Sequence, residues 1–390
     1  MSDLKIAADV SSFEELSDAL HIKSVNVINV MSDITFTQNI LSIPLRDVSI
    51  FGRGHKITSK SFAIYGAVST AQQGVLRLFD MTIEGHEASG RIFEHVSTGW
   101  DMEIRDVVYS GSRLAHLSRG TLTCSGQNSI TTTHENAWVE NVIFEEGCSY
   151  EGVASLTAST SAFYFNGLSK NGSVILNKKS NVKLKVGGGK YDLYPAFYDR
   201  VNLIDVGDSA SLDINSYGYA IHFIRADMDH DAKVIVAENA VLNLNGEGGG
   251  NKPTVKFDFT GNIEVEKLGA LTISGNPKSE LYAVIEMAKG SEIKLGAVAY
   301  TKIFNQRKGG PLFNATQTTF STGMVSSISV WGKSGGDYES PAMAVWKDTK
   351  MATTLNKDQS SNTTSTDESL QASFQMSAYG CIELISNVNP

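Results

Sequence analysis

The chain has 390 residues, a formal net charge of −9 at pH 7 and a pI near 5.4. This acidic balance argues against nucleic acids and anionic membranes as partners, because both require a concentrated basic surface. No apolar run approaches the length of a membrane span, and the first residues lack the apolar segment of a signal peptide. If the protein is exported, we expect this sequence to be a mature part of it; these features alone leave a cytosolic product as the alternative.

The first predicted element is a helix over residues 12–23. Ser12 is followed three residues later by Glu15, which is the spacing of a capping box. Leu16 and Leu20 then mark one apolar face. A short amphipathic helix at this place would cover the open end of a repetitive β-structure, where a strand edge is otherwise exposed.

A short motif recurs through the first half: an apolar residue, any residue, Asp or Asn, and then two apolar residues separated by one position. Its copies are Leu45–Ile50, Leu78–Ile83, Ile104–Tyr109 and Val139–Phe144. Each copy predicts a strand, a sharp turn and a second strand, because Asp and Asn tolerate the left-handed conformation. Stacked at one corner of successive coils, these polar side chains would form a ladder that satisfies turn amides.

In the second half, apolar pairs separated by one residue return with a strand period. The pairs are Val182/Leu184, Leu212/Ile214, Leu242/Leu244, Leu271/Ile273 and Ile293/Leu295. Their first members lie 30, 30, 29 and 22 residues apart. Alternation at i and i+2 places both side chains on one face of a strand, so this repeat predicts a parallel β-solenoid with inward stacks. The 35 Gly and only 7 Pro agree, because Pro would delete ladder hydrogen bonds.

The pattern divides the chain into three regions: residues 1–24 as an N-terminal arm and capping helix, residues 25–313 as the parallel β-helix, and residues 314–390 as a strand-rich C-terminal cap. Within the cap we expect strands at residues 327–331, 372–376 and 381–385, and a loop or hairpin arm at residues 363–367. Trp331 and Trp346 are expected in the core of the cap. The last residues resemble the cut edge of a longer protein.

Three cysteines are present, at positions 124, 148 and 381. Cys124 and Cys148 lie 24 residues apart, close to one short coil, so stacked neighbours would come within disulfide reach. Both also suit small buried positions, and the two alternatives stay open. No spacing among the cysteines and the eight histidines matches a metal or redox site.

An aromatic cluster is the main candidate for ligand binding. It comprises Tyr191, Tyr194, Phe197 and Tyr198, with Asp192, Asp199 and Arg200 beside them and Tyr217 and Tyr219 one coil later. Amphipathic rings supply contact area with little loss of entropy, which suits sugars and protein partners alike. The alternative is an aromatic stack inside the solenoid that contributes only to stability.

An acidic segment is the candidate for a cation. Asp227, Asp229 and Asp231 alternate around His230, and carboxylates that converge in a turn can hold Ca²⁺. The segment lacks the central Gly and final Glu of an EF-hand, and the alternative is a solvated polar loop. We expect no other cofactor.

Several stretches together resemble a known family. Residues 13–16, 25–30 and 48–57 follow the order of the pectate lyase-like adhesive domain of large Gram-positive surface proteins, and residues 240–244, 269–273 and 331–346 fit its later part. The resemblance implies a right-handed parallel β-helix. It also implies an extracellular location, on an exported chain anchored at the cell wall.

Three functions compete. The first is a non-catalytic cell-surface adhesin module, expected to be a monomer, whose side wall near residues 191–219 binds a glycan or a protein of a host or microbial surface. The second is a polysaccharide lyase or hydrolase. No Arg stands two residues before a Pro, as in the lyase signature, and neither an Asp-Asp nor a His-Gly pair is present. The third is a structural stalk or phage-spike segment, for which the sequence shows no apolar outer stripe. The sequence favours the adhesin.

Overall fold

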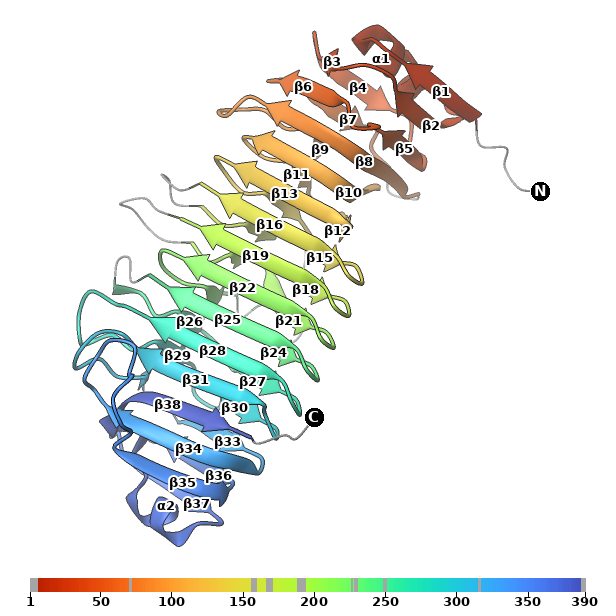
Figure 1. Ribbon diagram of the computed structural model, residues 1–390. Helices are drawn as coiled ribbons and strands as arrows, with labels where there is room; N and C mark the ends of the chain where they lie inside the picture. The colour runs from red at the N-terminus through yellow and green to blue at the C-terminus, as the bar shows by residue number, and fades with distance from the viewer. Residues whose placement is uncertain are drawn as a thin grey trace.

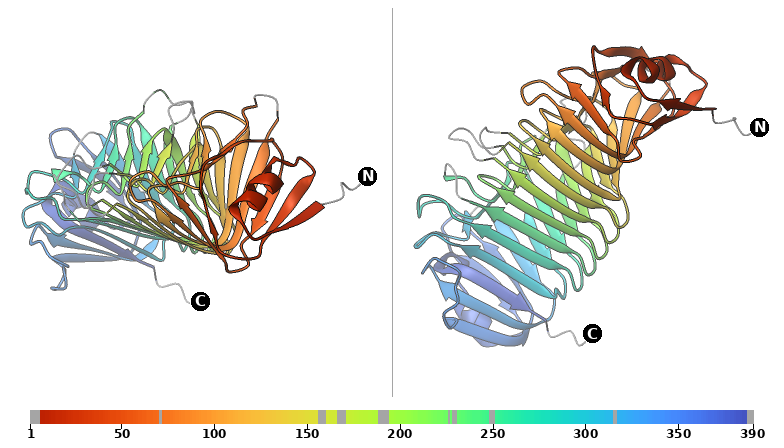
Figure 2. Two further views of the ribbon diagram at one scale, coloured as in Figure 1. Left: turned by 90° about the horizontal axis from the view of Figure 1, so that it is seen from above. Right: turned by 45° about the horizontal axis from the view of Figure 1, so that its top comes forward.

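The computed structural model describes residues 6–69, 72–155, 160–165, 171–187, 194–225, 227, 231–247, 251–314 and 317–386. Its strands wind into coils that stack along one axis, from α1 at one end to α2 at the other (Figure 1, Figure 2). Strands of successive coils pair in parallel. The predicted all-β parallel β-helix is confirmed.

Three walls surround the core, and most coils contribute one strand to each wall. The first wall contains β1 (Ile6–Val10), β2 (Val25–Val30), β5 (Val48–Phe51), the start of β8 (Gly74–Gly85), the start of β10 (Trp100–Gly111), β12 (Thr121–Ser125), β15 (Asn141–Phe144), β18 (Gly172–Leu176), β21 (Val201–Val206), β24 (Ala232–Val236), β27 (Gly261–Val265), β30 (Glu292–Leu295) and β33 (Thr318–Thr322).

The second wall contains β3 (Ile34–Thr35), β6 (Lys56–Lys60), the ends of β8 and β10, β13 (Gln127–Thr132), β16 (Ser149–Ala154), β19 (Asn181–Val186), β22 (Ser211–Ser216), β25 (Val241–Gly246), β28 (Ala270–Gly275) and β31 (Tyr300–Asn305). The third wall contains β4 (Ile40–Ile43), β7 (Ile64–Gly66), β9 (Phe93–His95), β11 (Ala115–Leu117), β14 (Ala137–Val139), β17 (Phe163–Phe165) and β20 (Phe197–Asp199). It continues with β23 (Ile221–Phe223), β26 (Val255–Phe257), β29 (Ile285–Met287) and β32 (Phe313–Asn314).

The predicted inward stack lies on the second wall. Leu242 pairs in register with Leu212 on one side and with Leu271 on the other. The parallel row two residues along consists of Ile214, Leu244 and Ile273. Each of these six side chains is at most 1% exposed, so the predicted alternation is confirmed.

The last apolar pair of the sequence pattern belongs to a different wall. Ile293 and Leu295 lie on β30 of the first wall, where Ile293 pairs with Ile263. On the second wall the stack continues with Thr301 and Ile303 of β31. The shorter spacing of 22 residues reflects this change of wall, because it does not span a whole coil.

The Asp/Asn motif marks two kinds of corner. β8 and β10 pass from the first wall to the second at Asp80 and Asp106, whose φ angles of 52° and 58° turn the strands. Asp47 and Asn141 instead stand where the chain enters the first wall from the third. The predicted turns are confirmed. The prediction of one polar ladder is wrong, because the four Asp and Asn residues lie at two different corners. The same residue pattern suits either corner, since each joins two strands whose apolar side chains point into the core.

Helix α1 (Phe13–His21) begins at the predicted N-cap. The Ser12 Oγ accepts the backbone N–H of Glu15 at 3.2 Å, and the Glu15 carboxylate accepts the N–H of Ser11 at 2.6 Å. Arg46 then donates to the carbonyls of Ala19, Val25 and Pro44, and so connects the end of α1 to the first coils. The helix lies at the N-terminal end of the stack (Figure 1), while its capping role stays a prediction.

The C-terminal region extends the first and second walls with antiparallel strands. These are β34 (Val325–Gly332), β35 (Ala344–Thr349), β36 (Met351–Leu355), β37 (Ser361–Ser365) and β38 (Tyr379–Ile385), with β38 between β31 and β34. The predicted strand over residues 372–376 is wrong: α2 (Glu368–Ser373) ends there, and the Asp367 carboxylate caps it. A short 3-10 turn, Met376–Ala378, follows. Trp331 and Trp346 are buried.

All three cysteines are buried and free, so Cys124 and Cys148 occupy filler positions in the core. Burial raises the pKa of the Cys148 thiol to about 12.

Truncation of Leu242 to Ala is expected to lower the free energy of unfolding by about 2–5 kcal/mol, because a cavity replaces a fully buried side chain. The matched control is Asn243→Ala, which changes the neighbouring outward side chain and should shift stability by less than about 0.5 kcal/mol. Urea denaturation of both variants checks this. Equal effects would mean that the alternation is assigned to the wrong face.

Candidate functional site

The third wall consists of two sheets, and each carries a row of outward side chains. Its strands are mostly three residues long, with buried first and third residues and a half-buried middle residue that points outward. In chain order, the outward residues are Tyr65, Glu94, His116, Trp138, Tyr164, Tyr198, His222, Lys256 and Glu286. Parallel pairing aligns these positions from Tyr65 to Tyr198 in one sheet and from His222 to Glu286 in a second sheet.

Four of these residues form an aromatic stack, here called the outer ladder: His116, Trp138, Tyr164 and Tyr198. Successive ring centroids lie 4.5, 5.0 and 5.5 Å apart. The Tyr164 and Tyr198 rings are stacked at 28°, whereas the other two pairs are tilted or edge-on. Tyr194 packs against Tyr198 at 4.5 Å in a T-shaped arrangement and is 38% exposed. Among these five rings Tyr194 has the largest exposed fraction.

The residues of the predicted aromatic cluster lie on both sides of the third wall, and their role in ligand binding stays a prediction. Phe197 points inward and stacks on Phe163 at 6.2 Å, fully buried, whereas Tyr198 points outward on the same strand. Tyr191 and Asp192 lie outside the described residues. Tyr219 is largely buried and stacks on His222 at 4.4 Å, and Tyr217 is half-buried.

Asp199 organises the polar groups beside the outer ladder. Its carboxylate is nearly buried and accepts hydrogen bonds from Arg225 Nε at 2.5 Å and from the Tyr164 hydroxyl at 3.4 Å. The bond to Asp199 raises the pKa of Arg225, while burial and then the Asp199 charge raise the pKa of Tyr164. The Arg225 side chain remains 48% exposed, so a fixed guanidinium borders the rings.

Arg200 forms an ion pair with Asp227, one of the three predicted cation ligands. Arg200 donates to Asp227 at 2.9 Å, and this bond lowers the pKa of Asp227. Asp231 is exposed, and Asp229 lies outside the described residues. In the described part of the chain, no three His, Cys, Asp or Glu side chains gather closely enough for a metal ion. Asp227 thus fits an ion pair better than a cation, and the Ca²⁺ site stays a prediction.

The N-terminal part of the outer ladder, at His116 and Trp138, is also bordered by arginines that pair with carboxylates. Arg113 lies over the Trp138 ring at 4.2 Å and pairs with Glu135 at 2.5 Å. Glu135 also accepts a hydrogen bond from Trp138 Nε1 at 3.1 Å. The Glu94 carboxylate pairs with Arg91 and lies 3.7 Å from His116. Arg91, Arg113 and Arg225 thus each have a carboxylate partner beside these rings.

The outward row becomes charged beyond Tyr198. His222 Nε2 lies 2.8 Å from Asp258, and Lys256 pairs with Asp258 at 3.2 Å and with Glu286 at 3.4 Å. Burial lowers the pKa of His222 against the opposing effect of Asp258.

Sequence reasoning missed His116, Trp138, Tyr164 and His222, which lie far apart along the chain. A local signal exists for two of them, Tyr164 and His222: Ala followed by an apolar residue, the outward residue and another apolar residue. It occurs at residues 162–165 and 220–223. Strand pairing in the folded coils brings His116, Trp138 and Tyr164 together in the outer ladder.

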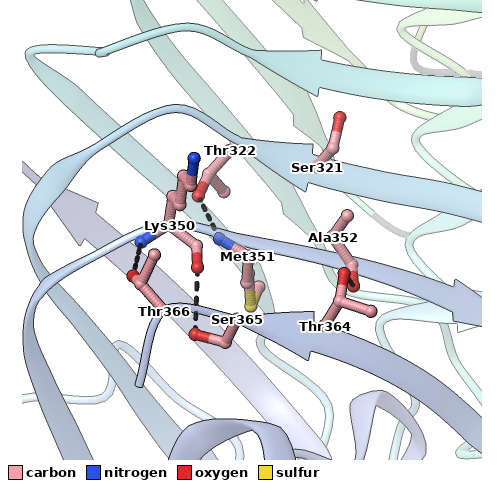
Figure 3. Close-up of a pocket in the computed structure, with 8 residues that line it drawn as sticks. All are labelled: Ser321, Thr322, Lys350, Met351, Ala352, Thr364, Ser365 and Thr366. Atoms are coloured by element: carbon pink, nitrogen blue, oxygen red, sulfur yellow. Dashed lines mark hydrogen bonds between the residues drawn. The ribbon is translucent and has the colours of Figure 1, made fainter. Parts of the chain in front are cut away.

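A separate depression lies on the C-terminal strands (Figure 3). Its cavity volume is about 300 Å³, and it is lined by Ser321, Thr322, Lys350, Met351, Ala352, Thr364, Ser365 and Thr366. Most polar groups here bond to each other: Ser365 Oγ donates to the Lys350 carbonyl, and Thr366 Oγ1 accepts the Lys350 N–H. These bonds hold the β36–β37 hairpin, so the depression is a weaker candidate for ligand binding.

The N-terminal part of the chain is similar to a known protein family. Residues 7–116 match the family model described as "Putative pectate lyase-like adhesive domain". This confirms the family resemblance over that part of the chain. The resemblance drawn for residues 240–273 and 331–346 stays a prediction.

Two solved structures show a general likeness. The L. reuteri 100-23 SRRP shares 14% identity, with a TM-score of 0.48 and coverage of 82% of this chain and 96% of that one. The L. reuteri 53608 SRRP shares 16% identity, with a TM-score of 0.34 and coverage of 81% and 99%. No curated protein matches the chain.

A pair of substitutions on β20 tests which way its side chains point. Phe197→Ala should lower the free energy of unfolding by about 3–5 kcal/mol, because the ring is fully buried. Tyr198→Ala should cost only about 1 kcal/mol, since it removes ring contacts at the surface. Thermal and urea denaturation of the two variants measure the contrast. A larger loss for Tyr198 would place its ring in the core.

Proposed function

We propose that this chain is a non-catalytic adhesive module of a bacterial cell surface, and that it binds a glycan through the third wall. The outer ladder carries the proposal. Outward positions of a solenoid wall are usually polar, yet here successive coils place His116, Trp138, Tyr164 and Tyr198 in one row. The match of residues 7–116 to an adhesive domain supports the adhesive role.

The groups around the rings favour a glycan over a charged protein surface. The cations of Arg113, Arg200 and Arg225 all have carboxylate partners, so the local charge is balanced. In each ion pair the carboxylate and the guanidinium hold each other in place. The N–H groups and carboxylate oxygens that the pair leaves unused then have fixed directions, which suits hydrogen bonds to sugar hydroxyls. The open ring of Tyr194 offers an apolar surface for the C–H face of one sugar.

Binding at such a wall is expected to be weak for a single module. A shallow surface removes little ligand area from water, so only a few contacts contribute. Many modules on one cell can compensate, because binding of one raises the effective concentration of the others. A module of this kind acts at the cell surface. In the described part of the chain, no helix is long and apolar enough to cross a membrane.

The double variant Tyr194→Ala/Tyr198→Ala tests the proposed wall. Glycan ligands are first identified on an array, and adhesion of protein-coated beads to them is then measured. We expect at least a roughly tenfold loss of affinity, as for truncation of a binding hot spot. The matched control is Tyr300→Ala, an outward aromatic of the second wall. Equal adhesion of the double variant and the control, with unchanged melting temperature, would refute the proposal.

The absence of catalysis has its own test. Incubation with polygalacturonate, with and without Ca²⁺, should produce neither unsaturated products nor new reducing ends, because no lyase or hydrolase signature is present. Absorbance and a reducing-sugar assay measure the two products. Turnover that disappears on substitution of Asp227 or Arg225 would establish an enzyme instead.

A further inference from the structure

A groove on the second wall lies apart from the outer ladder. It is open, has a cavity volume of about 430 Å³, and is lined by Asp106, Val108, Gln127, Asn128, Ser129, Ser149 and Glu151. These residues belong to β10, β13 and β16, the strands of three successive coils. The groove therefore occupies the same stretch of the rod as Trp138 and Tyr164, but on another wall.

Strand register places the groove side chains in two rows. Val108, Ser129 and Glu151 are cross-strand partners in one row, and Gln127 and Ser149 are partners in the next. All five are exposed, and Val108 is 51% exposed. Neighbouring strands lie about 4.8 Å apart, so side chains of different chemistry stand close together along the groove.

The polar side chains of these rows have no internal partners. In the part of the chain that the structure describes, no hydrogen bond or ion pair engages the side chains of Gln127, Ser129, Ser149 or Glu151. Beside them, Asp106 and Asn128 are engaged: Asp106 accepts the N–H of Gln127, and Asn128 bonds to backbone atoms at both ends of its amide. Asp106 and Asn128, which form hydrogen bonds within the protein, thus make up the border of the groove. The side chains without such bonds face its open space.

A second hollow lies at the ends of β8, β10 and β13, two of which also line the groove. Its cavity volume is about 310 Å³, and its lining includes Glu84, Ser110 and Thr131. Ser110 pairs with Thr131 and with Glu84, in the row two residues beyond Val108 and Ser129. The two hollows therefore lie at neighbouring rows of the second wall, an arrangement that suits a ligand of several sugar units.

We propose that this groove is a second saccharide site, specific for neutral hydroxyl-rich oligosaccharides. Glu151 accepts hydrogen bonds from two sugar hydroxyls, while Gln127, Ser129 and Ser149 both donate and accept. Val108 provides the apolar contact for a sugar C–H face. No arginine lines the groove, so an anionic sugar finds no guanidinium there. The site is independent of the outer ladder, and ligands on two walls would add avidity.

The probes are neutral hexasaccharides of glucose, mannose and galactose, titrated by isothermal calorimetry and by saturation-transfer NMR. At least one should bind the full chain, and Gln127→Ala/Glu151→Ala should weaken it at least tenfold. Glu151→Gln, which keeps the shape of the side chain, should give an intermediate loss because the amide accepts fewer hydrogen bonds. Circular dichroism and melting temperature of each variant verify that it is folded.

Two further variants locate the binding. Asn243→Ala, an outward change on the second wall away from the groove, should leave the affinity unchanged within twofold. Tyr194→Ala/Tyr198→Ala should also leave it unchanged, whether or not the third wall binds its own glycan. The proposal is overturned if none of the three hexasaccharides binds. It is equally overturned if the Gln127/Glu151 variant binds as tightly as the unchanged chain, or if only the tyrosine variant loses binding.

Discussion

In-register parallel pairing between coils is the constraint on which the rest of the structure depends. It repeats each position at the spacing of neighbouring strands, about 4.8 Å, so residues many positions apart in sequence become direct neighbours. Inside the rod it aligns Leu212, Leu242 and Leu271. Outside, the same pairing aligns Trp138, Tyr164 and Tyr198. One geometric rule therefore produces both the core and the surfaces.

The two candidate binding walls differ in how their polar groups are engaged. On the third wall, ion pairs such as Arg225–Asp199 and Arg113–Glu135 fix planar groups beside aromatic rings. On the second wall, the groove side chains remain available to water or a ligand, and Val108 replaces the aromatic rings. The first arrangement is rigid before a ligand arrives, whereas the second pays more conformational entropy on binding.

The candidate site could be predicted only in part. The sequence pointed to Tyr194 and Tyr198 because several aromatic residues are close together there. It did not show that Phe197 turns inward, since alternation cannot be assigned without knowing where the short strand begins. Tyr164, Trp138 and His116 stood alone in the sequence, and the coil lengths between them vary. Variable loops hide the spatial period, so only the folded coils reveal the row.

The fold itself was determined largely by local pattern. Alternating apolar pairs such as Leu242/Leu244, the Ser12 cap of α1 and the corner residues Asp80 and Asp106 each depend on short-range chemistry, which a single sequence displays. Tertiary structure decided which wall each strand joins, as Ile293 shows, and that residues 372–376 follow a capped helix. It also decided which polar groups meet in ion pairs. These outcomes depend on contacts between residues far apart in the chain. The free energy of such contacts cannot be read from a local sequence pattern.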